Sequence, residues 1–173
     1  MTVEQAYDSI SSGGAGDFLE VIAACAQGGD YCLIGGLAVN HYVEPVYTMD
    51  ADFVLAAHAL AGLGDNLKAK GFVVEDFPHS LNLQKPGSKL RIQFTKDARY
   101  KDFPVRAVEG DIFGVKVKIA SLKDLIQAKV WAWSDPQRRA TKRKKDELDL
   151  MRIGETYPEL AAMLPQEIRE LIE

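Results

Sequence analysis

The segment from residue 34 to residue 55 holds the side chains whose types and spacing best suit chemistry. Asp50 and Asp52 lie two residues apart in a run with strand character. Alternate residues of a strand point to the same face, so both carboxylates emerge together. Two carboxylates on one face can bind one hard cation, because Mg²⁺ and Mn²⁺ prefer oxygen ligands. The spacing therefore predicts a divalent metal site.

A glycine pair lies just upstream of these aspartates. Gly35 and Gly36 follow a short apolar run, residues 31–34, that predicts a strand, and they precede a predicted helix over residues 37–43, which Pro45 prevents from continuing. The first backbone N–H groups of a helix have no partner within it and attract phosphate. A Gly-Gly pair is more often a simple turn. Beside the aspartates, however, it predicts a site for a metal-bound triphosphate.

The remaining chain offers alternating helices and strands that could position this site. A glycine turn separates two short strand-like runs, which predicts a β-hairpin, and Ser121 begins a helix with a capping-box pattern. This alternation predicts an α/β to α+β fold, a small mixed sheet flanked by helices. The predicted helices cover residues 17–27, 56–70, 122–133 and 145–153, with short helices after Pro158, and the predicted strands cover residues 50–55, 72–75, 81–84, 89–95 and 110–119.

One cation lies on a helix face that should be buried. Counted in helical steps from Leu122, the apolar stripe of the helix over residues 122–133 passes through Lys129. Two interpretations remain open. The aliphatic stem could pack on the core while the ammonium reaches solvent. Alternatively, the ammonium could pair with an anion, either a phosphate or the carboxylates of Asp146 and Asp149.

Length and composition predict an ordinary globular protein. The chain has 173 residues, of which 47% are hydrophobic and 27% charged, which suits one domain over residues 1–173. No apolar stretch reaches the roughly 20 residues that a membrane span needs. The first ten residues also lack the pattern of a secretory signal. We therefore expect a cytoplasmic protein that does not associate with a membrane.

A basic run over residues 138–145 stands out in a chain whose net charge is −4. Such a run is most often a solvated loop, and a more specific interpretation is contact with the phosphate backbone of an RNA acceptor, such as a tRNA end. The residues proposed for this contact are Arg138, Arg139, Lys142 and Arg143.

These motifs together resemble those of the nucleotidyltransferase superfamily. The resemblance is narrower to the minimal nucleotidyltransferases grouped with AbiEii-type toxins, where a strand ends in Gly-Gly or Gly-Ser and a later strand carries Thr-x-Asp-x-Asp. Here the glycines are Gly35 and Gly36, and the second motif runs from Thr48 through Asp50 to Asp52. The resemblance continues downstream in two segments, residues 121–133 and the Lys-Asp-x-x-Asp-Leu run over residues 145–150. The resemblance covers residues 16–153 and leaves a helical tail over residues 154–173.

The resemblance implies transfer of a nucleoside monophosphate from a nucleoside triphosphate to a hydroxyl acceptor. The cofactor implied is Mg²⁺ or Mn²⁺, held by Asp50 and Asp52, which are also the implied catalytic residues. The implied nucleotide-binding residues are Gly35, Gly36, Thr48 and Lys129.

Two departures from the family pattern favour an alternative. Active members usually carry a third carboxylate on a later strand, where this chain has Gln93, and often an arginine where it has Tyr47. An amide cannot accept the acceptor's proton. The alternative is a degenerate nucleotide-binding module that acts through a partner, such as a cognate antitoxin, in a toxin–antitoxin or regulatory system. An acid elsewhere, such as Asp97 or Asp111, would restore the enzyme interpretation if it faced the aspartate pair.

Overall fold

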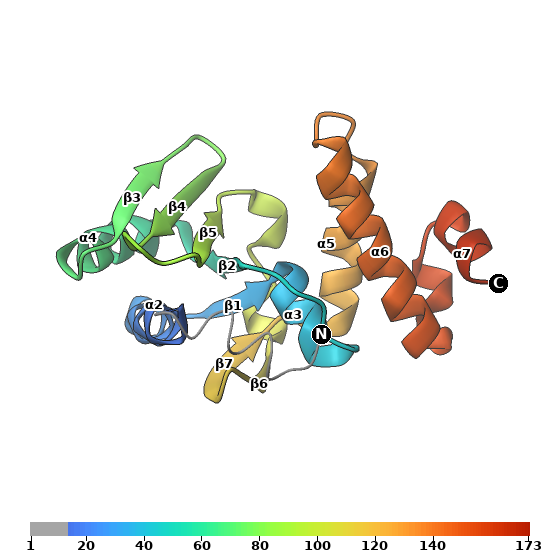
Figure 1. Ribbon diagram of the computed structural model, residues 1–173, viewed down its shortest axis with the longest axis horizontal. Helices are drawn as coiled ribbons and strands as arrows, with labels where there is room; N and C mark the ends of the chain where they lie inside the picture. Colours follow the sequence, from blue (N-terminus) through green and yellow to red (C-terminus); the bar gives the residue numbers. More distant parts are fainter. Residues whose placement is uncertain (1–13) are drawn as a thin grey trace.

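The fold is built on one mixed sheet of seven strands in the order β3-β4-β5-β2-β1-β7-β6 (Figure 1). The computed structural model describes residues 14–173, and the segment on which the leader-peptide prediction rests lies outside this range. The strands are β1 (Tyr31–Ile34), β2 (Asp50–Leu55), β3 (Val73–Asp76), β4 (Ser80–Gln84), β5 (Arg91–Thr95), β6 (Val108–Ile112) and β7 (Val115–Ile119).

Two parallel pairings lie at the centre of the sheet. β1 runs parallel to β7 and β2 parallel to β5, while the other neighbours are antiparallel. Alternation on β5 follows the prediction, because Ile92 and Phe94 are buried whereas Arg91 and Gln93 are exposed. The register of β2 with β5 places Gln93 directly beside Asp52. The mixed sheet expected from the sequence is therefore confirmed.

The helices lie on both sides of this sheet. α2 packs against α4, α3 against β2 and α5, and α6 packs between α5 and α7 (Figure 1). None of the described helices is long and apolar enough to cross a membrane. The helices are α2 (Gly14–Gly28), α3 (Gly35–Tyr42), α4 (Leu60–Ala69), α5 (Leu122–Ser134), α6 (Ala140–Thr156) and α7 (Gln166–Ile172), with short 3₁₀ turns at Ala57–Ala59, Ala98–Tyr100, Pro104–Arg106 and Pro158–Met163.

The two faces of β2 have different surroundings. Phe53 stacks on Phe94 of β5 with ring centroids 5.2 Å apart, and its ring also lies 6.0 Å from that of Phe18 on α2. α2 thus covers the apolar face of the central strands. Because strand side chains alternate, Asp50 and Asp52 point to the opposite face, toward α5 and α6.

Several predicted element boundaries are wrong. Residues 110–119 form two antiparallel strands rather than one, because Phe113 and Gly114 adopt positive φ and make the turn of a β6–β7 hairpin. The helix predicted from residue 56 begins at Leu60, after a 3₁₀ turn. α6 begins at Ala140, so most of the basic run is helical and not a loop. The cap on α5 is confirmed, since Ser121 Oγ accepts a hydrogen bond from the backbone N–H of Asp124.

Candidate metal and nucleotide site

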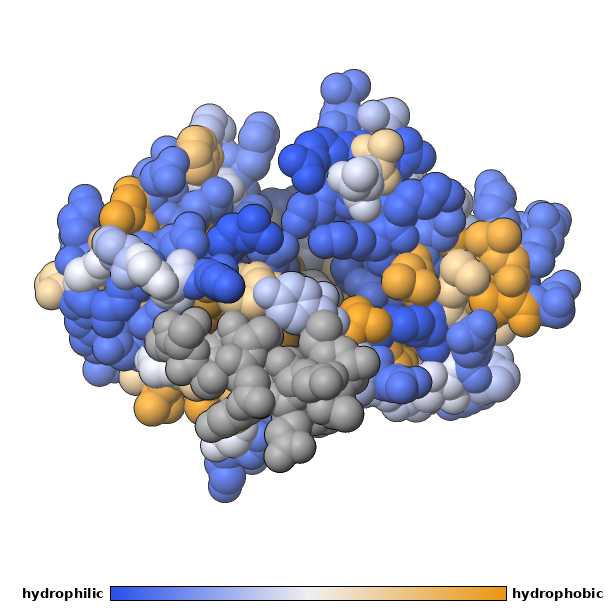
Figure 2. Space-filling view, in the orientation of Figure 1, coloured by the Kyte–Doolittle hydropathy of each residue, from blue (hydrophilic) through white to orange (hydrophobic). Residues whose placement is uncertain are grey.

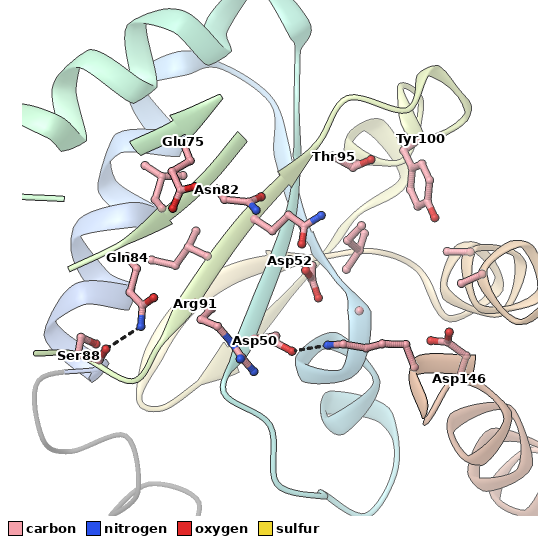
Figure 3. A pocket seen from close by; sticks show the side chains of 18 of the residues that line it. Asp50, Asp52, Glu75, Asn82, Gln84, Ser88, Arg91, Thr95, Tyr100 and Asp146 are labelled. Carbon is pink, nitrogen blue, oxygen red and sulfur yellow. Dashed lines mark hydrogen bonds and ion pairs between the residues drawn. The ribbon is translucent and has the colours of Figure 1, made fainter. Parts of the chain in front are cut away.

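A cavity of about 880 Å³ lies between the polar face of the sheet and helices α5 and α6. Asp50 and Asp52 of β2 line it (Figure 3). Gly35 at the start of α3 and Lys129 of α5 line it as well. The surface is hollowed between the strand half and the helices, and hydrophilic residues surround much of the hollow (Figure 2). The structure therefore places the predicted aspartates and the first glycine in one cavity.

Gly35 allows the start of α3 to approach Asp52 closely. Its φ is +75°, a left-handed conformation that favours glycine, and a Cβ atom there would collide with Asp52 Oδ2. The helix starts at Gly35 itself, two residues before the predicted start, so the glycines form its first turn. The first turn of α3, whose N–H groups have no partner within the helix, therefore lies close to the Asp52 carboxylate. Such N–H groups can bind a metal-bound phosphate.

The carboxylate of Asp52 accepts no hydrogen bond from any residue in the described range 14–173. Within residues 14–173 it takes part in no hydrogen bond or ion pair, although it lines the cavity. Burial, followed by the charge of Asp50, raises the pKa of Asp52 from 3.8 to about 6. A partly buried carboxylate without a partner fits a cation ligand, because a bound cation would offset both effects. The two aspartates therefore suit a divalent ion.

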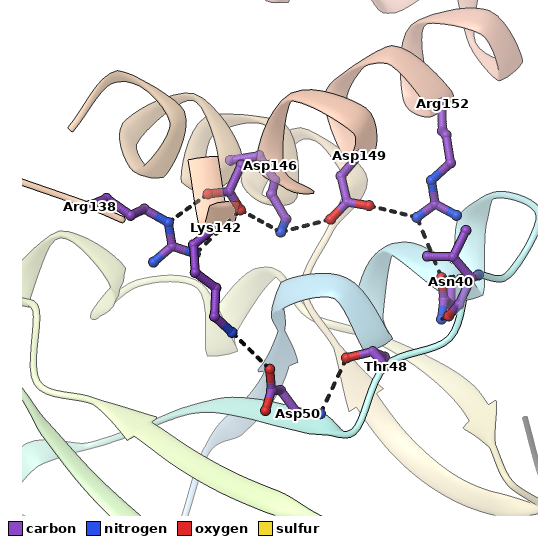
Figure 4. Close-up of polar contacts among 10 residues, drawn as sticks. Asn40, Thr48, Asp50, Arg138, Lys142, Asp146, Asp149 and Arg152 are labelled. Carbon is purple, nitrogen blue, oxygen red and sulfur yellow. Dashed lines mark hydrogen bonds and ion pairs between the residues drawn. The ribbon is translucent and has the colours of Figure 1, made fainter. Parts of the chain in front are cut away.

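Asp50 has the opposite surroundings. Its Oδ1 accepts a hydrogen bond from Arg91 Nε at 2.7 Å. Its Oδ2 accepts one from Lys142 Nζ at 3.0 Å (Figure 4). Burial alone would raise the pKa of Asp50, but Lys142 and Arg91 outweigh it and lower the pKa below its ordinary value. The pair thus divides into one carboxylate with two cations and one with none.

Thr48 supports the strand rather than lining the cavity. Its Oγ1 accepts a hydrogen bond from the backbone N–H of Asp50 at 3.2 Å, which fixes the start of β2 (Figure 4). Thr48 is absent from the cavity walls. Its role in nucleotide binding stays a prediction.

The position at which the resemblance implies a third carboxylate holds an amide. Gln93 lines the cavity beside Asp52, and the same row continues across the sheet through Asn82 to Glu75. Among residues 14–173, no group of three or more histidines, cysteines or acids could hold a metal ion. The fit to a metal therefore rests on two carboxylates.

Neither acid considered as a substitute faces the site. Asp97 binds Arg99 in the turn after β5. Asp111 lies on β6 at the far edge of the sheet, where it accepts a hydrogen bond from the backbone N–H of Gly114. Neither lines the cavity.

Lys129 pairs with two buried acids. Its Nζ lies 2.9 Å from Asp146 Oδ1 and 2.8 Å from Asp149 Oδ2, and its side chain is only 11% exposed. Burial alone would lower its pKa, but Asp149 and Asp146 outweigh burial and raise the pKa above its ordinary value. The interpretation that the ammonium pairs with an anion is confirmed, and the one in which it reaches solvent is wrong.

The basic run is largely engaged with the protein itself. Arg138 Nε binds Asp146 Oδ2 at 2.6 Å, Lys142 binds Asp50, and Arg143 Nε donates to the backbone carbonyl of Trp133. Arg139 is exposed at the start of α6. Sequence reasoning placed Lys142 in an RNA contact and missed its position in the cavity, which depends on where α6 begins.

Arg91 was also missed as a site residue. The sequence does contain a signal for it, because Arg91 and Gln93 are two residues apart and share the polar face of the same predicted strand. The register of β2 with β5 then places Arg91 directly beside Asp50.

Comparison with solved structures identifies the fold. No protein-family model matches the sequence, and no curated protein sequence matches it. The antibiotic-resistance factor ANT(2'')-Ia in solution superposes with a TM-score of 0.60 at 15% identity, over 91% of this chain and 87% of that one. Its crystal structure in complex with adenylyl-2''-tobramycin gives 0.58 at 15% identity, over 90% and 94%. A Helicobacter pylori protein assigned as a nucleotidyltransferase gives 0.53 at 18% identity, over 95% and 73%. The chain has the nucleotidyltransferase fold.

The raised pKa of Asp52 predicts how stability depends on pH. The pKa of an aspartate in an unfolded chain is about 3.9, whereas burial raises the pKa of Asp52 in the folded protein to about 6. The folded state therefore binds this proton more tightly, so the stability contributed by Asp52 is full below about pH 4 and is lost as the pH rises through about 6. One proton changes the free energy of unfolding by at most about 1.4 kcal/mol per pH unit. Urea unfolding in EDTA should show this slope in the wild type and not in Asp52→Asn. Equal pH profiles would contradict the assignment.

Proposed function

We propose that this protein transfers a nucleoside monophosphate from a nucleoside triphosphate to a hydroxyl acceptor, with Mg²⁺ or Mn²⁺ as cofactor. The observation that carries the proposal is the meeting of Asp50, Asp52 and the first turn of α3 in one cavity. The nucleotidyltransferase fold supports it, as does a structural neighbour bound to an adenylylated small molecule.

The residues of this chain divide the work of binding and positioning. Asp50 and Asp52 would hold the divalent ion, which supplies positive charge against the phosphate oxygens. Backbone N–H groups at Gly35 and Gly36 would bind the phosphates beside it. Attack by the acceptor hydroxyl on the α-phosphorus would form the new P–O bond and break the bond from the α-phosphorus to the oxygen shared with the β-phosphorus. Pyrophosphate would leave, and the hydroxyl proton would pass to water. Such a reaction depends mainly on positioning and electrostatics, so few side chains can suffice.

A second candidate function is nucleotide binding without efficient transfer. The observation that favours it is Gln93 beside Asp52, together with the failure of Asp97 and Asp111 to face the cavity. Such a module would act through a partner protein, and the resemblance to AbiEii-type proteins suggests a cognate antitoxin. Both candidates require the same metal and nucleotide site.

Pyrophosphate release separates the two candidates. Wild type and Asp52→Asn would be incubated with each of the four nucleoside triphosphates, with and without bulk RNA as a source of acceptor hydroxyls, in MgCl₂ or in EDTA. The transferase proposal expects release with at least one nucleotide, only with metal and only in the wild type. Nucleotide binding without release would favour the module, and absence of both would overturn the two proposals together.

RNA remains a proposed acceptor through Arg138, Arg139, Lys142 and Arg143. Because three of them already have partners within the protein, Arg139 offers the cleanest test. Arg139→Ser should weaken RNA binding a fewfold and flatten its dependence on salt, as loss of one phosphate contact would. Filter binding at several salt concentrations measures this. Wild type that fails to bind RNA at low salt would exclude this acceptor.

A further inference from the structure

The cavity holds two cations whose only ion-pair partner, within the described residues, is a proposed metal ligand. Arg91 and Lys142 approach Asp50 from opposite walls, one from β5 and the other from α6. They occupy different oxygens of its carboxylate, and both line the cavity. A divalent ion that binds Asp50 must share this carboxylate with both cations or displace them.

The other cations of the site differ in this respect. Lys129 and Arg138 pair with Asp146 (Figure 4), and Lys129 also pairs with Asp149. Lys85 pairs with Asp17 and Glu20. None of these acids is proposed to bind metal. Binding of a metal to Asp50 and Asp52 leaves those pairs intact. Only Arg91 and Lys142 would have to change partners.

The charges indicate what the new partner would be. Arg91 and Lys142 balance the two carboxylates of the metal site, so these four side chains carry no net charge when all are ionised. A bound divalent ion leaves a surplus of two positive charges, flanking the start of α3. A triphosphate is the anion that such a surplus would attract, because charge-assisted contacts from arginine and lysine to phosphate are strong.

We propose that Arg91 and Lys142 are triphosphate-binding residues that pair with Asp50 as long as no metal and nucleotide are bound. The inference rests on the proposed function and adds to it an exchange of partners. The carboxylate of Asp50 releases the two cations and binds the metal, and the two cations bind the phosphates. The same residues thus oppose binding of metal alone and favour binding of metal with nucleotide.

This exchange predicts effects of opposite sign in one variant. Lys142→Met should bind Mn²⁺ alone about threefold to tenfold more tightly than the wild type, because a competing charge is removed. The same variant should bind the Mn²⁺ complex of a non-hydrolysable ATP analogue about tenfold more weakly, because a charge-assisted contact to phosphate is lost. Arg91→Met should behave alike, whereas Lys142→Arg should stay near wild type in both measurements.

Isothermal titration calorimetry measures both affinities, and the chain offers matched controls. Lys145→Met on α6 and Lys89→Met before β5 each remove one positive charge from an exposed side chain that does not line the cavity. They should change neither affinity by more than about twofold, because exposed charges are screened.

The outcomes distinguish this inference from the proposed function. Weaker binding of both ligands in Lys142→Met and Arg91→Met would show that the cations only support the fold and would overturn the exchange. Unchanged nucleotide binding in these variants would overturn it as well. Failure of the wild type to bind Mn²⁺ through Asp50 and Asp52 would instead overturn the proposed function on which the exchange rests.

Discussion

Replacing Gln93 by glutamate should raise the rate of pyrophosphate release by about 10²–10⁴-fold, the typical contribution of a general base. Gln93 lies beside Asp52 in the register of β2 with β5 and faces the cavity. Glutamate keeps the length of glutamine and supplies an oxygen that can accept the proton of the attacking hydroxyl. Gln93→Asp adds the same charge on a side chain one methylene shorter. At least one of the two variants should release pyrophosphate faster than the wild type.

The control for the expected gain in rate adds the same negative charge on β4, one strand farther from Asp52. Asn82 lies beside Gln93 in the same row, about 10 Å from Asp52 because neighbouring strands are about 4.8 Å apart. Asn82→Asp should therefore leave the rate near wild type. If both Gln93 variants fold and bind Mg²⁺ without exceeding the wild-type rate, position 93 is not where the third carboxylate acts.

Replacing Lys129 by methionine should lower the free energy of unfolding by about 3–5 kcal/mol, the usual cost of breaking a buried ion pair from one side. Lys129 contacts both Asp146 and Asp149, whose side chains are nearly inaccessible. Its removal leaves Asp146 with Arg138 and Asp149 with Arg152. Each of these two buried carboxylates would then have lost one of its two cations. Urea unfolding at neutral pH measures the change.

An exposed ion pair on the neighbouring helix provides the comparison. Lys144 of α6 binds Glu147 and its side chain is 76% exposed, so Lys144→Met should cost less than about 1 kcal/mol. A loss below about 1 kcal/mol in Lys129→Met would show that water already solvates this cluster.

The parts of the site that the sequence predicts are those set by local spacing. Asp50 and Asp52 share a face because strand side chains alternate. Lys129 stands out because a cation interrupts a helical apolar stripe. Gly35 also follows from local pattern, although its close approach to Asp52 becomes visible only in the structure. In each case the decisive geometry lies within a few residues of chain.

The parts that the sequence does not predict depend on tertiary packing. Lys142 reaches Asp50 across 92 positions of sequence, and this contact exists only because α6 begins at Ala140 and packs on α5. A run of lysine and arginine suggests a solvated loop, yet both residues are good helix formers. The β6–β7 hairpin was missed because its alternation continues on both sides of a turn of only two residues.

The response of the folded protein to metal tests the account most directly. The thermal midpoint would be measured at increasing MgCl₂ or MnCl₂ for the wild type and for the double variant Asp50→Asn/Asp52→Asn. The wild-type midpoint should rise with metal concentration, because a ligand that binds the folded state stabilises it by about 2.7 kcal/mol at one hundred times its dissociation constant. The double variant should show no rise. An equal rise in both proteins would contradict a metal site at these two aspartates, and with it the proposed function.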